Sequence, residues 1–162
     1  PEGFFFKLDS RSPKDTEVPR YTLDNIGDLP DAFFNSSRML DDLCAQRFHR
    51  DTFVLCFRRW MELKDEHRAF VKDGKLQGVS WYDYRNPPAA SATPPIQHPW
   101  GVATSYLQQI LPHMPIKDFV FDFGYLPDDS IMLIELNPYW LSDPCCFVSY
   151  DRISGYAYGM VA

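Results

Sequence analysis

The chain has 162 residues, of which 45% are apolar and 16% aromatic, and its formal net charge is −6. This composition excludes a chain that is disordered throughout, and the length fits one domain, or two small lobes that share a core. The acidic balance argues against nucleic acid as a partner. No apolar run approaches the roughly 18 residues of a membrane span and no signal peptide is recognisable, so we expect a cytoplasmic protein with no membrane partner.

The N-terminal part of the chain predicts a strand, a helix and a second strand. "FFFKLD" alternates, with Phe4 and Phe6 on one face, as a strand does. Residues 16–34 contain turn formers and little periodicity. "NSSRMLDDLCAQRF" predicts a helix that is capped by Asn35 or by one of the serines after it. "TFVLCF", residues 52–57, is continuously apolar, which predicts a strand buried on both faces.

The remainder of the chain predicts two hairpins separated by a loop and a helix. In "HRAFVKDGKLQGVSWYDY", Asp73-Gly74 is a strong hairpin turn signal. Residues 86–99 are rich in Pro and Ala and predict a flexible loop. "WGVATSYLQQILP" has helical periodicity and ends at Pro112. "DFVFDFGY" and "SIMLIELN" form the last pair of strands, turning near 127–129. This order of elements predicts an α+β fold with mainly antiparallel sheets.

The cysteines and histidines do not form a recognisable site. The four cysteines are Cys44, Cys56, Cys145 and Cys146, and no C-x-x-C occurs. Without an export signal we expect these cysteines to be reduced and buried. The four histidines are scattered without metal-ligand spacing, so a zinc site is not expected.

Three polar residues interrupt the last pair of apolar strands. Glu135 and Asn137 are two residues apart and therefore share one strand face, and a hairpin register brings Asp122 opposite or nearly opposite Glu135. Two carboxylates and an amide oxygen are hard ligands that suit Mg²⁺ bound together with substrate phosphates. Without a cation, two buried carboxylates would repel each other and one would protonate. The alternative is that each residue lies on an edge strand and faces water.

Basic residues are placed on several strands and loops of this acidic chain, where they can surround a common cleft. Magnesium-bound phosphates need such cations on the side opposite the carboxylates. Solvated strand edges are the alternative interpretation. The P-loop, the Rossmann glycine motif and the kinase signatures are all absent. The basic residues concerned are Lys7, Arg11, Lys14, Arg58, Arg59, Arg68 and Lys72.

Five blocks of the sequence, in order, resemble the cell-division-cycle-123 family of the ATP-grasp superfamily. These blocks are "FFFKLDSRSPKD", "NSSRMLDDL", "FVLCFRRWMEL", "EHRAFVKDGKLQGVSWYDY" and "DFVFDFGYLPDDSIMLIELNPY". The resemblance covers most of the chain from residue 4 to about residue 147. It implies a single ATP-grasp-like domain over 1–162 with a nucleotide cleft between two lobes and a hinge near 58–63.

The resemblance also implies roles for individual residues. Lys7, Lys14, Arg68 and Lys72 are expected to contact the phosphates of ATP. The residues expected to line the adenine pocket are Arg59, Trp60 and Met61, and those expected to hold Mg²⁺ are Asp122, Glu135 and Asn137. The residues expected to stabilise the transferring phosphoryl group are Arg11, Lys14 and Arg68.

The sequence departs from the family pattern at several places. Glu135 stands where the family commonly has Asp, and "DSRSPKD" replaces the usual "NWSAPKD". Residues 86–95 differ from a usually Tyr-rich segment, and the N-terminal region that normally precedes the first strand is missing. These departures indicate a divergent or truncated relative.

The resemblance leaves three functions open. The first is an ATP-dependent ligase that joins a carboxylate to an amine or thiol. The second is an ATP-dependent assembly factor, because the eukaryotic family binds the gamma subunit of translation initiation factor 2. The third is an ATP-grasp remnant without activity.

Overall fold

A computed structural model describes residues 3–9, 12–13, 15, 21–22, 27, 29–46, 52–83, 85, 98–153 and 157–159. The chain divides into two compact units, Pro1–Met61 and Glu62–Ala162. The boundary after Met61 falls within the range 58–63 for which the sequence analysis predicted a hinge. The predicted loop over residues 86–99 lies mostly outside the described residues. Among the described helices, none is long and apolar enough to cross a membrane.

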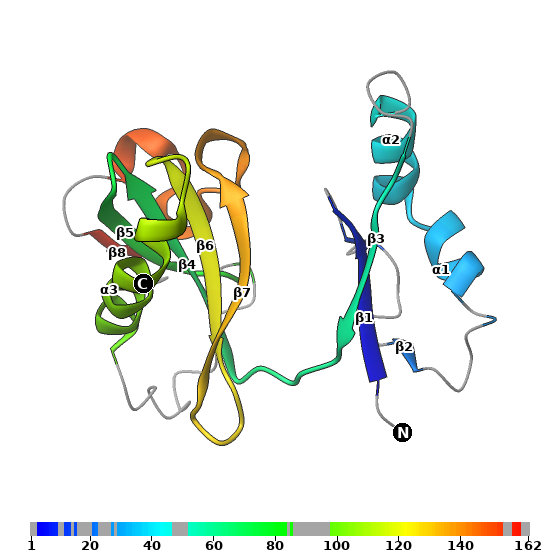
Figure 1. Cartoon of the computed structure of the whole chain (residues 1–162), viewed down its shortest axis with the longest axis horizontal. Coiled ribbons are helices and arrows are strands. Elements are labelled where there is room, and N and C mark those ends of the chain that lie inside the picture. The colour runs from blue at the N-terminus through cyan, green and yellow to red at the C-terminus, as the bar shows by residue number, and fades with distance from the viewer. Residues whose placement is uncertain are drawn as a thin grey trace. The chain divides into compact units, whose positions relative to one another are not determined.

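The first unit is a small sheet covered by two helices (Figure 1). Its strand order is β2-β1-β3, with both pairs antiparallel. The strands are β1 (Gly3–Leu8), β2 (Tyr21–Thr22) and β3 (Leu55–Arg59), and the helices are α1 (Leu29–Phe34) and α2 (Ser37–Gln46). The predicted alternation of β1 is confirmed, because Phe4, Phe6 and Leu8 are buried in one cluster with Met39 of α2.

Helix α2 begins where the capping pattern predicted. Ser36 is its N-cap, and its Oγ accepts a hydrogen bond from the Met39 amide at 3.2 Å. Asp15 adds a second cap, accepting from the Ser36 and Ser37 hydroxyls and from the Arg38 amide. Helix α1 was not predicted, since six residues beginning Leu-Pro are too short to show helical periodicity.

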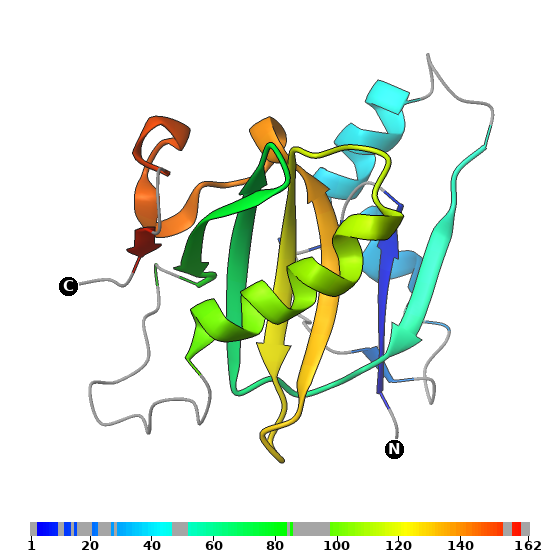
Figure 2. The same cartoon turned by 60° about the vertical axis from the view of Figure 1, so that its left-hand side comes forward.

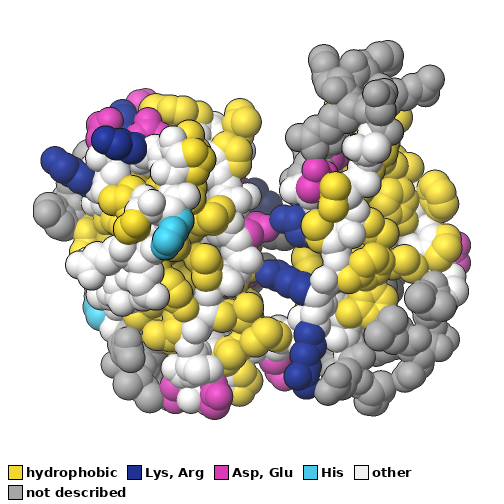
Figure 3. Space-filling view, viewed as in Figure 1, with side chains coloured by type: hydrophobic (Ala, Val, Ile, Leu, Met, Phe, Trp, Pro, Cys, Tyr) yellow, Lys and Arg dark blue, Asp and Glu magenta, His cyan; other side chains and the backbone are white. Residues whose placement is uncertain are grey.

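Strand β3 corrects one sequence prediction. The apolar run 52–57 was expected to be buried on both faces, but every residue of β3 is exposed, and Phe57 keeps 53% of its surface. The reason is position, because β3 pairs with β1 on one side and no described strand pairs with its other side. Figure 3 shows the hydrophobic side chains that remain at the surface of this unit. An apolar run fixes neither strand order nor burial.

The second unit is a five-stranded sheet of order β7-β6-β4-β5-β8, in which only the β5–β8 pair is parallel. One face is crossed by helix α3, as Figure 2 shows, and the other is covered by short 3₁₀ turns. The strands are β4 (Asp65–Lys72), β5 (Lys75–Trp81), β6 (Phe119–Tyr125), β7 (Ile131–Pro138) and β8 (Ala157–Gly159). The helix is α3 (Pro99–Ile110), and the turns are η2 (Leu111–His113), η3 (Tyr139–Leu141), η4 (Cys145–Phe147) and η5 (Tyr150–Arg152). The predicted α+β class with mainly antiparallel sheets is confirmed.

Both predicted hairpins form. The β4–β5 turn has positive φ at Asp73 (52°) and Gly74 (70°), the backbone that a tight hairpin requires and that Gly adopts without strain. The β6–β7 hairpin turns after Leu126, whose amide donates to the Ser130 carbonyl at 2.8 Å. A bulge next to Asp122 shifts the register of this hairpin.

The two faces of this sheet differ in chemistry. The face under α3 holds an apolar cluster that includes Ala69, Val71 and Phe121. Because strand side chains alternate, Arg68 and Phe70 point to the opposite face, where Phe70 packs with Tyr139. The strands therefore separate a packing face from a face that carries charge.

The cysteines are free, as predicted, but their burial is mixed. Cys145 is buried and Cys146 is partly buried, whereas Cys44 and Cys56 are exposed. The expectation that all four are buried is therefore wrong, since Cys56 lies on the exposed strand β3 and Cys44 on an exposed position of α2.

Candidate functional site

A buried ion pair lies at the centre of the five-stranded sheet. Arg68 on β4 and Asp122 on β6 are direct partners in the antiparallel register. Arg68 Nε donates to Asp122 Oδ1 and Nη2 donates to Oδ2, both at 2.8 Å, and the two side chains are 6% and 0% exposed. Paired donors of this kind form the stronger class of charge-assisted hydrogen bond. Burial lowers the pKa of Arg68, but the hydrogen bonds and charge of Asp122 more than offset this and raise it above its ordinary value.

Glu135 and Asn137 on β7 complete a cluster around Asp122. Glu135 is the register partner of Asp122, as the hairpin argument predicted. The Asn137 amide nitrogen, Nδ2, donates to Asp122 Oδ2 and to Glu135 Oε1, both at 3.2 Å. Glu135 and Asn137 are partly buried. The three side chains predicted to converge therefore do converge on one face of the sheet.

The structure corrects two expectations about this cluster. Asp122 is not a water-facing edge residue, because β6 lies inside the sheet and its side chain is fully buried. The two carboxylates do not require a metal to avoid repulsion, because the Arg68 guanidinium neutralises Asp122. Alternation along the strand predicts the face of each residue, but the neighbour across β4 and β6 depends on strand order.

The donor types of this cluster fit Mg²⁺, which prefers oxygen ligands and is usually held by one or two carboxylates plus substrate phosphates. Asp122 and Glu135 supply carboxylate oxygens. Asn137 presents its nitrogen to them, and a half-turn of the amide presents its oxygen instead. Among the described residues, no group of three or more His, Cys, Asp or Glu side chains is placed to hold a metal. The cluster therefore suits a metal shared with a ligand rather than one enclosed by protein groups alone.

Arg68 is fixed by further contacts beyond the ion pair. Its Nη1 donates to the Asp143 carbonyl oxygen at 3.1 Å, and its guanidinium lies 4.7 Å from the centre of the Tyr82 ring. Lys72 is on the same strand face, with Nζ 5.2 Å from the centre of the Trp140 ring. Arg68 is thus a buried, oriented cation, and Lys72 a partly buried one at the rim of the same face.

The other predicted nucleotide residues belong to the first unit. Lys7 is partly buried on β1 opposite Cys56 on β3. Arg59 ends β3 and is exposed, Trp60 donates its amide to the Gly3 carbonyl at 2.8 Å, and Met61 is 38% exposed. The predicted phosphate residues Arg11 and Lys14 lie outside the described residues.

Sequence reasoning missed two residues that contact this cluster. Asp143 anchors Arg68 through its carbonyl, and Tyr82 lies against the same guanidinium. The Asp143-Pro144 pair is a turn signal that marks this bend after β7. No sequence signal pointed to Tyr82, because its role depends on the placement of Arg68.

Comparison with known proteins agrees with this fold. A search of curated protein sequences finds no match. C-terminally truncated Cdc123 from Schizosaccharomyces pombe is similar in structure, with a TM-score of 0.70 and 18% identity, over 98% of this chain and 73% of that one. A second structure of Cdc123 from the same organism gives a TM-score of 0.61 and 18% identity, over 96% and 71% of the two chains. These likenesses confirm the Cdc123-like fold that the sequence blocks suggested.

A family model gives the more direct assignment. Residues 24–151 match a model of the ATP-grasp domain, the second family of its clade. The match spans α2, the β4–β5 hairpin and the whole β6–β7 hairpin that carries Asp122, Glu135 and Asn137. The chain therefore belongs to this family of ATP-grasp domains.

Proposed function

We propose that this domain binds Mg²⁺–ATP and uses it to join a carboxylate to an amine or a thiol. The observation that carries the proposal is the cluster of Asp122, Glu135 and Asn137 beside Arg68 on one sheet face of an ATP-grasp domain. ATP-grasp domains generally bind ATP with Mg²⁺, and the donor types of the cluster suit that metal.

Each predicted residue has a role in this proposal. Asp122, Glu135 and Asn137 hold Mg²⁺, which when bound neutralises charge on the transferring phosphoryl group. Arg68 keeps Asp122 ionised and presents a fixed positive charge. The phosphates are also contacted by Lys7, Arg11, Lys14 and Lys72, and the adenine by Arg59, Trp60 and Met61. The segment 58–63 acts as the hinge, and 86–99 as a flexible loop.

The reaction needs no nucleophilic side chain. A substrate carboxylate oxygen attacks the γ-phosphorus of ATP, and ADP leaves, which gives an acyl phosphate. An amine nitrogen then attacks the carbonyl carbon, phosphate leaves with the bonding electrons, and the amine proton passes to solvent. The described residues agree, because burial raises the pKa of the Cys145 thiol to about 12 and keeps it protonated near neutral pH.

An ATP-dependent assembly factor is the second candidate. The Cdc123-like fold favours it, since the sequence resemblance implies a partner like the gamma subunit of translation initiation factor 2. In that case ATP binding stabilises a protein surface and is not followed by ligation.

Incubation with Mg²⁺, ATP and panels of acids and amines distinguishes these functions. A ligase forms one ADP per product and needs both an acid and an amine. Tight ATP binding with no ADP release, together with capture of the gamma subunit, favours the assembly factor. An Asp122→Asn protein should lose either activity, and Asp128→Asn, an exposed carboxylate in the same hairpin, is the matched control.

A further inference from the structure

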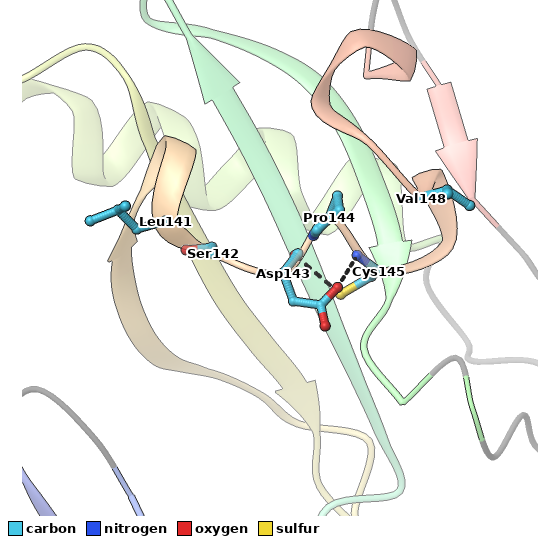
Figure 4. Close-up of a pocket in the computed structure, with 6 residues that line it drawn as sticks. All are labelled: Leu141, Ser142, Asp143, Pro144, Cys145 and Val148. Atoms are coloured by element: carbon cyan, nitrogen blue, oxygen red, sulfur yellow. Dashed lines mark hydrogen bonds between the residues drawn. The ribbon is translucent and has the colours of Figure 1, made fainter. Parts of the chain in front are cut away.

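A pocket lies beside the Arg68 cluster, in the segment that follows β7. Its volume is about 500 Å³. Figure 4 shows Leu141 and Val148 at opposite ends of the lining segment, with Asp143 and Cys145 between them. The lining residues are Leu141, Ser142, Asp143, Pro144, Cys145 and Val148.

Among these described lining residues, the Asp143 carboxylate is the only charged group. Its Oδ1 accepts a hydrogen bond from the Cys145 amide at 2.8 Å, and its side chain remains 49% exposed. The other polar side chains are directed to backbone groups, since the Ser142 hydroxyl donates to the Pro138 carbonyl and the Cys145 thiol to the Asp143 carbonyl. The pocket therefore offers one accessible negative charge between apolar walls.

The pocket is connected to the candidate metal cluster through a single side chain. The Arg68 guanidinium donates to the Asp143 carbonyl at 3.1 Å and to both Asp122 oxygens at 2.8 Å. A molecule in the pocket is therefore separated from the cluster by little more than one guanidinium group. The Arg85 guanidinium lies 3.9 Å from the Asp143 carboxylate, and its side chain is 75% exposed.

The backbone of the lining segment is held in an unusual conformation. Cys145 has a φ of 54° and Val148 a φ of 67°, and for a β-branched residue such a φ is a genuine outlier. The Val148 amide donates to the Cys145 carbonyl at 3.1 Å and the Ser149 amide to the Phe147 carbonyl at 2.7 Å, which fixes this bend. Strained backbone of this kind concentrates at ligand sites.

We propose that this pocket binds the acceptor substrate, and that the acceptor carries a primary ammonium group on a short apolar chain. The assignment rests on the proposed ligase function. Asp143 pairs with the ammonium, and Leu141, Pro144 and Val148 contact the chain. The same carboxylate disfavours an acid or a phosphate in this position, so the acyl donor and ATP bind elsewhere.

The test is a titration of the full chain with n-alkylamines and the corresponding n-alcohols, without ATP or Mg²⁺, followed by NMR of the backbone amides of residues 141–148. The amines should shift these signals, with affinity rising by up to about fourfold per added methylene, and the alcohols should bind much more weakly. Equal binding of alcohols, or no shift in this segment, overturns the assignment.

Two variants sharpen the test. Asp143→Asn keeps an oxygen for the Cys145 amide and should weaken amine binding about fivefold or more. Val148→Ala removes an exposed wall and should flatten the dependence on chain length. Asp151→Asn, an exposed carboxylate on η5, should change neither. An Asp143→Asn protein with unchanged amine affinity contradicts the proposal.

The turnover assay separates this inference from the function on which it rests. In Asp143→Asn the KM for the amine should rise while the KM for ATP stays constant. If the wild type binds amines at this pocket but does not bind ATP, the proposed function and the acceptor role both fail. If ATP turns over normally and the amine KM does not depend on Asp143, the pocket assignment alone fails.

Discussion

His67 and Arg68 are neighbours in sequence, but the two faces of the sheet treat them in opposite ways. His67 is fully buried, and neither ring nitrogen has a hydrogen-bond partner among the described residues. Its ring packs against Trp81, Phe123 and Tyr125, with ring centres 4.9, 5.5 and 5.8 Å away. Arg68 is also buried, but it is charged and bonded to Asp122 and the Asp143 carbonyl.

The difference shows how one strand serves two purposes. Under α3, His67 acts as a neutral aromatic side chain in an apolar core, and burial, with a smaller contribution from the charge of His98, lowers its pKa to about 4. On the other face, the cost of burying Arg68 is offset by a buried counter-charge. Stability comes from the first face, and the candidate chemistry is confined to the second.

The largest expected effect is the loss of Arg68. Arg68→Met should lower the free energy of unfolding by about 3–5 kcal/mol, because Asp122 is left buried and unpaired. Urea denaturation at pH 7 measures this change. A loss below about 1 kcal/mol, similar to that of an exposed pair, would show that the ion pair is not the organising contact of this face.

Acidification should test His67 next. Between pH 6.5 and about 4, the unfolded chain binds a proton at His67 that the folded chain does not bind, so stability falls as pH decreases through this window. The lost stability is roughly 3 kcal/mol at about 1.4 kcal/mol per pKa unit. His67→Leu, of similar volume, should remove this part of the pH dependence. Denaturation curves at pH 7 and pH 4.5 compare the two proteins, and equal slopes would contradict a neutral buried imidazole.

The smallest expected effect belongs to the rim of the charged face. Lys72 contacts the Trp140 ring, which is 59% exposed. Lys72→Met should therefore change the free energy of unfolding by no more than about 1 kcal/mol, the usual range of an exposed cation–π contact. Measured beside Arg68→Met, it serves as the control for removing a positive charge from the same strand.

Local patterns predicted much of this molecule. Alternation and turn residues placed Asp122 opposite Glu135, with Asn137 on the same face, because these features depend only on one hairpin. Strand order was not accessible, so the exposure of β3 and the pairing of Arg68 with Asp122 were missed. His67 reads as one polar residue within a strand, and its aromatic enclosure needs residues from three strands.

The most direct test of the central claim is a calorimetric titration of Mg²⁺–ATP into the wild type and into Glu135→Gln, beside a thermal melt without ligand. Glu135→Gln removes a partly buried charge and keeps the side chain's size, so affinity should fall about tenfold or more while the apo melting temperature stays close to that of the wild type. Asp128→Asn should match the wild type in both measurements. Unchanged affinity with a lowered apo melting temperature would contradict the account, because Glu135 would then be a structural polar group and not a metal ligand.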